Sequence, residues 1–247
     1  MRITVIGATG MVDSRIVAEA RARRHAVIAA SRNPKSADGA AQRIDSGNLV
    51  RFDPGVRFDP GVRFDPGVCS TGACSTGAES QMRVDAADPA AVDRALNGAE
   101  AVVLSVRAQA DKGEEFARLS STVLDCSAHA GVPLLIVGGA GPLLSPDEPG
   151  VAVIDVPRYV PLQWRSIAAA SIAQLDVCRN HANQVWTYLS PPAVLEPGTR
   201  TGVYQRGTTT LLTADDGSSC ISVEDLAVAV IDELESPGHE RRITVAH

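Results

Sequence analysis

Short aliphatic runs alternate with longer stretches of helical periodicity along this chain, and the alternation constrains the fold more than any other feature. Each strand-like run is followed by a segment whose apolar residues recur every three or four positions. This order indicates βαβ units and a parallel sheet. The predicted strands are 2–6, 26–31, a run that ends near 85, 99–106, 132–139 and 185–190, and the predicted helices are 11–24, 88–98, 114–130, 166–181 and 222–235.

The length suits one domain. A chain of 247 residues can bury a complete α/β core, and no linker divides it. We therefore expect a single domain over 1–247, with residues 185–247 forming a small C-terminal lobe on the substrate side. Aromatic residues make up only 4% of the chain, which suits small-residue helices packed on a sheet of valine, isoleucine and leucine.

Composition excludes several classes of ligand and location. The net charge is -6 and no dense Lys/Arg cluster occurs, so no nucleic-acid partner is expected. No apolar run approaches the roughly 20 residues of a membrane helix, and we expect no secretory leader before the first strand. The five cysteines lack metal-binding spacing, so we expect no metal, free thiols and a cytoplasmic location.

One segment departs from the alternation. Residues 50–67 are three copies of VRFDPG, and residues 69–78 are two copies of CSTGA. Each hexad contains an Asp-Pro-Gly turn and lacks helical or alternating periodicity. We interpret residues 36–80 as an expanded surface loop; a hexapeptide β-helix is the alternative, but three coils would bury little core.

The first strand leads into a glycine turn. In TVIGATGMVDS, residues 4–14, a strand precedes Gly7 and an amphipathic helix follows Gly10. Such a turn lets the backbone approach a pyrophosphate, while the helix N-terminus supplies free N–H groups and a positive dipole. A third glycine is due at position 13, where the chain has Asp13. A tight turn without a ligand is the alternative interpretation.

The end of the second strand indicates which dinucleotide would bind. It reads Ser31-Arg32-Asn33-Pro34 and carries no acid that could hold the ribose hydroxyls of NAD. An arginine there suits a 2′-phosphate, so the sequence favours NADPH over NADH. The alternative is a solvated arginine in a polar loop.

Several motifs together resemble a known family. GATG at 7–10, SRNP at 31–34, VDAADP at 84–89 and GGAG at 138–141 resemble the atypical short-chain dehydrogenases, which have a nucleotide-binding Rossmann fold. The longer stretches 186–207 and 221–245 are similar to bacterial proteins described as NADH-flavin reductases, relatives of flavin and biliverdin reductase B and of NmrA-like sensors. The resemblance covers nearly the whole chain except about 36–80.

The resemblance implies an α/β, Rossmann-like doubly wound fold with a mainly parallel sheet and a small C-terminal lobe. It implies a reductase that binds NADP, with NAD possible, and transfers hydride to a flavin or a similar planar small molecule, without a catalytic side chain of its own. A non-catalytic redox sensor of the NmrA-like type is the alternative. The oligomeric state stays open.

The same resemblance assigns positions around the cofactor. The glycine turn would surround the pyrophosphate. The end of the second strand would contact the adenosine phosphate, and the end of the third strand would flank the adenine. The fourth strand end would line the path to the nicotinamide, and the last positions would form the far wall. These residues are Gly7, Thr9, Gly10, Met11, Val12, Ser31, Arg32, Asp85, Ala86, Ser105, Val106, Gly138, Gly139 and Pro191.

The chain departs from the family at three places. Asp13 replaces a glycine, Pro142 a serine, and Trp164-Arg165 stand where relatives often have Tyr and Lys. No Tyr-x-x-x-Lys pair occurs, so alcohol–ketone chemistry lacks its acid/base group. A charged Asp13 about 6 Å from a phosphate would oppose it by roughly 1–3 kcal/mol, which weakens binding about tenfold or more.

Overall fold

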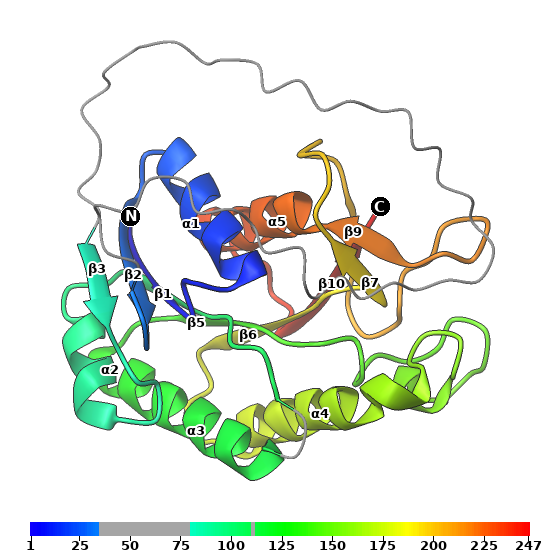
Figure 1. The fold of residues 1–247 in the computed structure, drawn as a ribbon, viewed down its shortest axis with the longest axis horizontal. Helices are drawn as coiled ribbons and strands as arrows, with labels where there is room; N and C mark the ends of the chain where they lie inside the picture. Colours follow the sequence, from blue (N-terminus) through cyan, green and yellow to red (C-terminus); the bar gives the residue numbers. More distant parts are fainter. Residues whose placement is uncertain (35–79, 110–111) are drawn as a thin grey trace. The chain divides into compact units, whose positions relative to one another are not determined.

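The structure, a computed structural model, describes residues 1–34, 80–109 and 112–247, so the repeats at 50–67 and 69–78 lie outside the described residues. Eight strands form one sheet in the order β3-β2-β1-β4-β5-β6-β10-β8 (Figure 1). All neighbours pair in parallel except β8, which runs antiparallel to β10. The mainly parallel, doubly wound α/β sheet is confirmed. Its strands are β1 (Arg2–Ile6), β2 (Ala26–Ser31), β3 (Ser80–Arg83), β4 (Ala101–Leu104), β5 (Leu134–Val137), β6 (Trp186–Ser190), β8 (Gln205–Gly207) and β10 (Arg242–Ala246).

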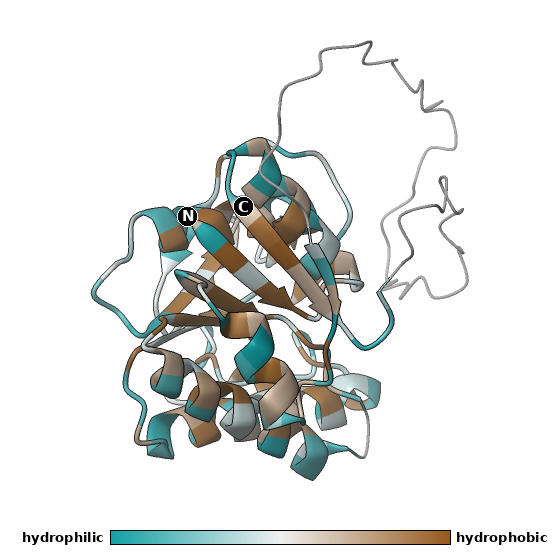
Figure 2. Cartoon of the chain, turned by 90° about the vertical axis from the view of Figure 1, so that its left-hand side faces the viewer, coloured by the Kyte–Doolittle hydropathy of each residue, from teal (hydrophilic) through white to brown (hydrophobic). Residues whose placement is uncertain are grey.

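Helices cover both faces of this sheet (Figure 1). Helices α1 (Met11–Ala22) and α5 (Val223–Glu235) lie on one face, and α2 (Pro89–Leu96), α3 (Gly113–Ala130) and α4 (Arg165–Asn180) lie on the other. Successive residues of one strand enter opposite layers: Val5 packs with α1 and α5, whereas Ile6 packs with α2 and α3. In Figure 2 the strands are coloured mostly as hydrophobic, and the helices carry hydrophilic residues as well.

The helix starts follow from local sequence. Ser222 is the N-cap of α5 and accepts a hydrogen bond from the Asp225 backbone N–H at 3.0 Å. Asp88 caps α2 in the same way, and Pro89 occupies the first helical position, where its missing N–H costs nothing. The predicted helices therefore agree with the structure to within a few residues at each end.

Residues 185–247 contribute more to the central sheet than the sequence indicated. Only β6 was predicted there, yet β8 and β10 extend the same sheet, and β7 (Val194–Glu196) pairs with β9 (Cys220–Ser222) in a separate two-stranded sheet. The separate lobe expected over 185–247 stays a prediction. Among the described residues, no helix combines the length and apolar character needed to cross a membrane.

Candidate functional site

The carboxyl ends of the parallel strands lie side by side at one edge of the sheet. The register places Ile6 next to both Ala30 and Leu104, and Leu104 next to Ile136. Strands β1 and β4 are neighbours in the sheet although β2 and β3 separate them in the chain. The strand order reverses between them, and ligands of open α/β sheets bind in the crevice at such a point.

Every site residue predicted from the sequence lies at or after one of these strand ends. The turn between β1 and α1 lies at the middle of this row of strand ends, beside β4. The residues after β2 and β3 lie on one side of the turn, and those after β4, β5 and β6 lie on the other side. Their contacts with a cofactor stay predictions. In sheet order the residues are Asp85 and Ala86 after β3, Ser31 and Arg32 at the end of β2, Gly7, Thr9, Gly10, Met11 and Val12 after β1, Ser105 and Val106 after β4, Gly138 and Gly139 after β5, and Pro191 after β6.

The glycine turn has the form that an anion site requires. Gly7 has a φ of +108°, and a Cβ there would collide with the carbonyl oxygen of Ser105, so position 7 tolerates only glycine. The N–H groups of Gly7 and Ala8 donate to the Ala30 carbonyl, which fixes the turn to β2. Gly10 is the N-cap of α1, and no side chain caps the helix there. Apart from the Asp13 N–H, which the Asp13 carboxyl group engages, the first-turn N–H groups of α1 are therefore available to a phosphate, and the turn fits a dinucleotide.

Asp13 lies directly beneath this turn. Its side chain is only 5% exposed, and a Cβ on Gly10 would collide with its Oδ2 atom. Its Oδ1 atom is buried and has no hydrogen-bond partner among the described residues. Burial raises the pKa of Asp13 to about 7, while hydrogen bonds from the Ser105 side chain and the backbone of Asp13 and Gly10 act to lower it. The carboxyl group of Asp13 is therefore only partly charged near neutral pH.

The end of β5 is shaped by a buried tyrosine. Tyr188 lies under Gly138, where any Cβ would collide with its phenol ring and hydroxyl. The hydroxyl donates to the carbonyl oxygen of Ser171 at 2.9 Å, and the side chain is fully buried. Burial also raises the pKa of Tyr188. Tyr188 is thus a structural support of the site and not a proton donor.

Beyond β4, a cation lies over an aromatic ring. The guanidinium carbon of Arg107 is 5.8 Å from the centre of the Trp164 ring. Arg107 is exposed, and Trp164 is half-buried at the start of α4, with an indole nitrogen that has no partner among the described residues. Sequence analysis did not predict this pair, because the two residues are distant in the chain and share no motif.

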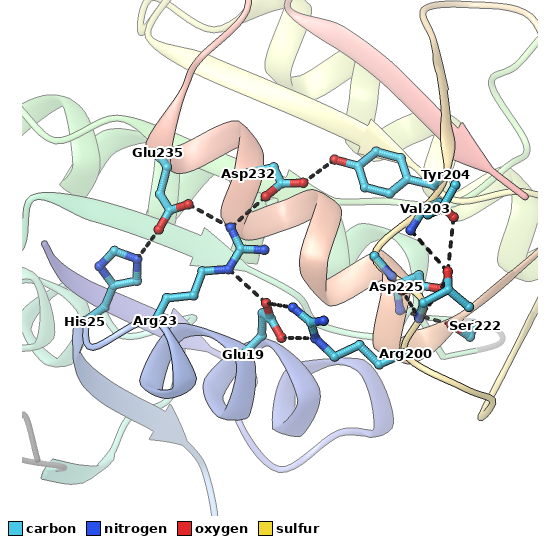
Figure 3. A network of polar contacts seen from close by, with 12 residues as sticks. Glu19, Arg23, His25, Arg200, Val203, Tyr204, Ser222, Asp225, Asp232 and Glu235 are labelled. Atoms are coloured by element: carbon cyan, nitrogen blue, oxygen red, sulfur yellow. Dashed lines mark hydrogen bonds and ion pairs between the residues drawn. The ribbon is translucent and has the colours of Figure 1, made fainter. Parts of the chain in front are cut away.

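A network of charged side chains joins α1 to α5 (Figure 3). Glu19 is 6% exposed and accepts hydrogen bonds from Arg200 at 2.7 and 2.8 Å and from Arg23 at 2.8 Å. Arg23 also bonds Asp232 at 2.6 Å and Glu235 at 2.7 Å. Glu19 and Arg23 belong to the end of α1 farthest from Gly10, so this network holds the helix in place and is separate from the strand ends.

A second buried acid secures the loop that precedes β8. Asp225 accepts hydrogen bonds from the backbone N–H groups of Thr201 and Gly202 at 2.9 and 2.7 Å and lies 2.9 Å from Nε2 of His247. Burial acts to raise the pKa of Asp225, but these hydrogen bonds outweigh it and the pKa is lowered. Asp225 therefore stays charged and anchors residues 201–202 to α5.

Comparison with known proteins gives one family and several full-length relatives. The model of a family described as NAD(P)H-binding matches residues 75–237. The uncharacterized protein YwnB of Bacillus subtilis (strain 168) is 28% identical over 247 residues, which is 99% of this chain and 98% of that protein. A "putative exported protein" from Burkholderia pseudomallei has a TM-score of 0.75 at 28% identity, with 100% of both chains covered. A "putative NADH-flavin reductase" from Streptococcus pneumoniae has a TM-score of 0.71 at 24% identity, with 100% of this chain and 99% of that chain covered.

Proposed function

Because this chain belongs to the NAD(P)H-binding family, we propose that it is an NADPH-dependent reductase that passes a hydride to a flavin or a similar planar acceptor. The observation that supports a bound dinucleotide is the N-terminus of α1, which no side chain caps. It follows a turn in which position 7 accepts only glycine. The bound nicotinamide would supply the hydride, and the chain would bind and orient both partners.

The residues that would hold the cofactor follow the order of the strands. The turn Gly7–Gly10 and the first N–H groups of α1 would hold the pyrophosphate. Arg32, exposed just after β2, would meet the 2′-phosphate, and this supports NADPH over NADH. NAD as an alternative cofactor would lose that contact and keep the others.

The residues expected near the nicotinamide support a planar acceptor over an alcohol or ketone. Alcohol–ketone exchange needs a group that moves a proton at the substrate oxygen, and the chain has no Tyr-x-x-x-Lys pair to supply it. Tyr188 is buried and bonded to Ser171, so it does not replace that pair. Hydride transfer to a flavin needs stacking in place of a protein acid.

The Arg107–Trp164 pair supports an acceptor that carries negative charge. Trp164 offers an aromatic face and Arg107 an exposed cation 5.8 Å from its centre. A flavin phosphate or another anionic group on a planar ring system would match this pair. The relative from Streptococcus pneumoniae is named for flavin reduction, which is consistent with the same acceptor class.

The test is to follow NADPH oxidation at a fixed enzyme concentration, with and without FMN, FAD and other planar acceptors. We expect oxidation only when an acceptor is present, and no reduction of NADP by simple alcohols. Arg107→Ala should raise the KM for FMN more than the KM for riboflavin, which lacks the phosphate. If NADPH binds but no acceptor in a broad panel is reduced, the reductase proposal fails and the non-catalytic sensor replaces it.

A further inference from the structure

The carboxyl group of Asp13 lies where an incoming pyrophosphate would act on it most strongly. It is buried under Gly10, the N-cap residue that directly precedes the first turn of α1. One of its oxygens, Oδ1, has no hydrogen-bond partner among the described residues. A buried carboxylate with an unsatisfied oxygen is costly, and a second anion placed above it increases that cost.

The neighbouring charges are engaged elsewhere. On α1 itself, the Arg15 Nε atom bonds Glu224 of α5 at 3.1 Å, and Glu224 also accepts the Gly198 N–H at 2.8 Å. Farther along the two helices, Glu19 and Asp225 are occupied by the contacts described above. Beyond β4, Arg107 lies over Trp164.

The strands under the turn supply no counter-charge either. Strands β1, β2 and β4 carry no ionisable side chain at their carboxyl ends, and Arg32 follows β2 on the adenosine side of the site. The groups that hydrogen-bond the Asp13 carboxyl, the Ser105 side chain and the backbone of Gly10 and Asp13, are all uncharged. Within the described residues, only a proton is left to neutralise Asp13 when a dinucleotide binds.

We propose that Asp13 makes this dinucleotide site proton-linked: the site binds NADPH or NADH with Asp13 in its neutral, carboxylic acid form, and binding takes up one proton from solvent. In the free protein at alkaline pH the group is a carboxylate. In the complex the same group is a carboxylic acid, and no other bond is made or broken. This inference rests on the dinucleotide-binding part of the proposed function and is independent of the acceptor.

The expected size of the effect follows from linkage. Because burial raises the pKa of Asp13 to about 7, the affinity should be nearly constant below about pH 6. Above about pH 7, each further pH unit should weaken binding by about tenfold, until the pKa of the complex is reached.

The experiment is titration calorimetry of the full chain with NADH, at about pH 6 and about pH 8 and in two buffers of different ionisation enthalpy. NADH is the primary probe because it lacks the 2′-phosphate, whose own titration near pH 6 would complicate the result with NADPH. We expect the dissociation constant to rise about tenfold between the two pH values and 0.5–1 proton, roughly, to be taken up near pH 7.5.

Asp13→Asn is the matched variant, since it keeps the shape of the neutral acid and cannot titrate. It should bind NADH with a pH-independent affinity close to that of the parent at about pH 6, without proton uptake. Asp13→Gly removes the carboxyl altogether and serves if the asparagine variant does not fold. A parent whose affinity does not change with pH, or a variant with the same pH slope as the parent, overturns the inference.

The outcome separates this inference from the reductase proposal. Proton-linked binding without NADPH oxidation in any acceptor keeps the inference and removes the reductase. Acceptor reduction with pH-independent binding keeps the reductase proposal and removes this inference. If neither NADH nor NADPH binds at any pH tested, both are overturned.

Discussion

The backbone of Gly138 rests on the buried phenol of Tyr188, so that no side chain can be added at position 138 without displacing the tyrosine. Tyr188 is in turn held by the Ser171 carbonyl of α4. The carboxyl end of β5 is therefore positioned by a residue of β6 and by α4, the helix that lies between β5 and β6 in the chain. This relationship fixes the backbone at the end of β5 against β6 and α4.

Gly138→Ala should lower the free energy of unfolding by about 2–3 kcal/mol, because the new methyl group overpacks the fully buried ring of Tyr188. Gly113→Ala is the matched control: nothing lies within 4 Å of a Cβ there, at the start of α3. Alanine at position 113 should be neutral or stabilise by up to about 1 kcal/mol. Urea unfolding of the three proteins measures both effects, and equal stabilities for the two variants would contradict the packing argument.

Arg32→Ala should remove the preference for NADPH, since the exposed guanidinium after β2 is the group expected to meet the 2′-phosphate. A charge-assisted contact of about 1.5–3 kcal/mol corresponds to a loss of about tenfold or more in NADPH affinity, with NADH nearly unchanged. Arg118→Ala, on the exposed side of α3, changes the net charge equally and should leave the preference intact. Fluorescence titration with both cofactors gives the ratio; an unchanged ratio in Arg32→Ala would remove the NADP assignment.

Asp13→Asn should stabilise the protein at pH 8 and have little effect near pH 4. The folded pKa of Asp13 is about 7 against an ordinary value of 3.8, so the folded state holds the proton more tightly than the unfolded chain. The parent therefore loses stability as pH rises from about 4 to about 7, by up to about 4 kcal/mol, and the asparagine variant lacks this loss. Unfolding free energies of both proteins across this range, without nucleotide, provide the check. A difference that stays constant with pH would mean that Asp13 titrates normally.

Arg200→Ala should destabilise the protein by about 1–2 kcal/mol, because Arg200 donates two hydrogen bonds to the buried Glu19. Arg179 pairs with Asp176 at 3.3 Å on the exposed surface, and Arg179→Ala should cost less than about 0.5 kcal/mol. The hydrogen bond from Arg200 lowers the pKa of Glu19, so this stabilisation is present at neutral pH and is lost as Glu19 becomes protonated in acid. Thermal melts at neutral and acidic pH would reveal both the size and this trend.

Much of the fold could be predicted because its signals are local. The Ser222 cap, the glycine turn and the runs of aliphatic residues each lie within one short segment, and the structure agrees with them. Strands β7, β8 and β9 were missed, since each has only three residues and is defined by its pairing; β10 was missed although it contains β-branched residues.

The candidate site was predictable in its positions and less so in its chemistry. The βαβ order alone predicts that the residues after each strand lie together at the carboxyl edge of the sheet. The raised pKa of Asp13 could not be predicted, because it depends on burial by the folded turn, which is opposed by a hydrogen bond from the Ser105 hydroxyl far along the chain. The Arg107–Trp164 pair likewise depends on how α4 packs beside the end of β4.

The pairing of α1 with α5 also sets the order in which this protein can be completed during its synthesis. Ile16, Val17 and Ala20 of α1 share one hydrophobic cluster with Leu226 and Val230 of α5. A nascent chain that has not yet reached α5 leaves that surface of α1 in contact with water. The glycine turn and α1 are synthesised well before α5, so the helix behind the turn stays uncovered until α5 has been made. Premature termination before Val223 would therefore yield a chain that exposes this apolar surface to chaperones and proteases.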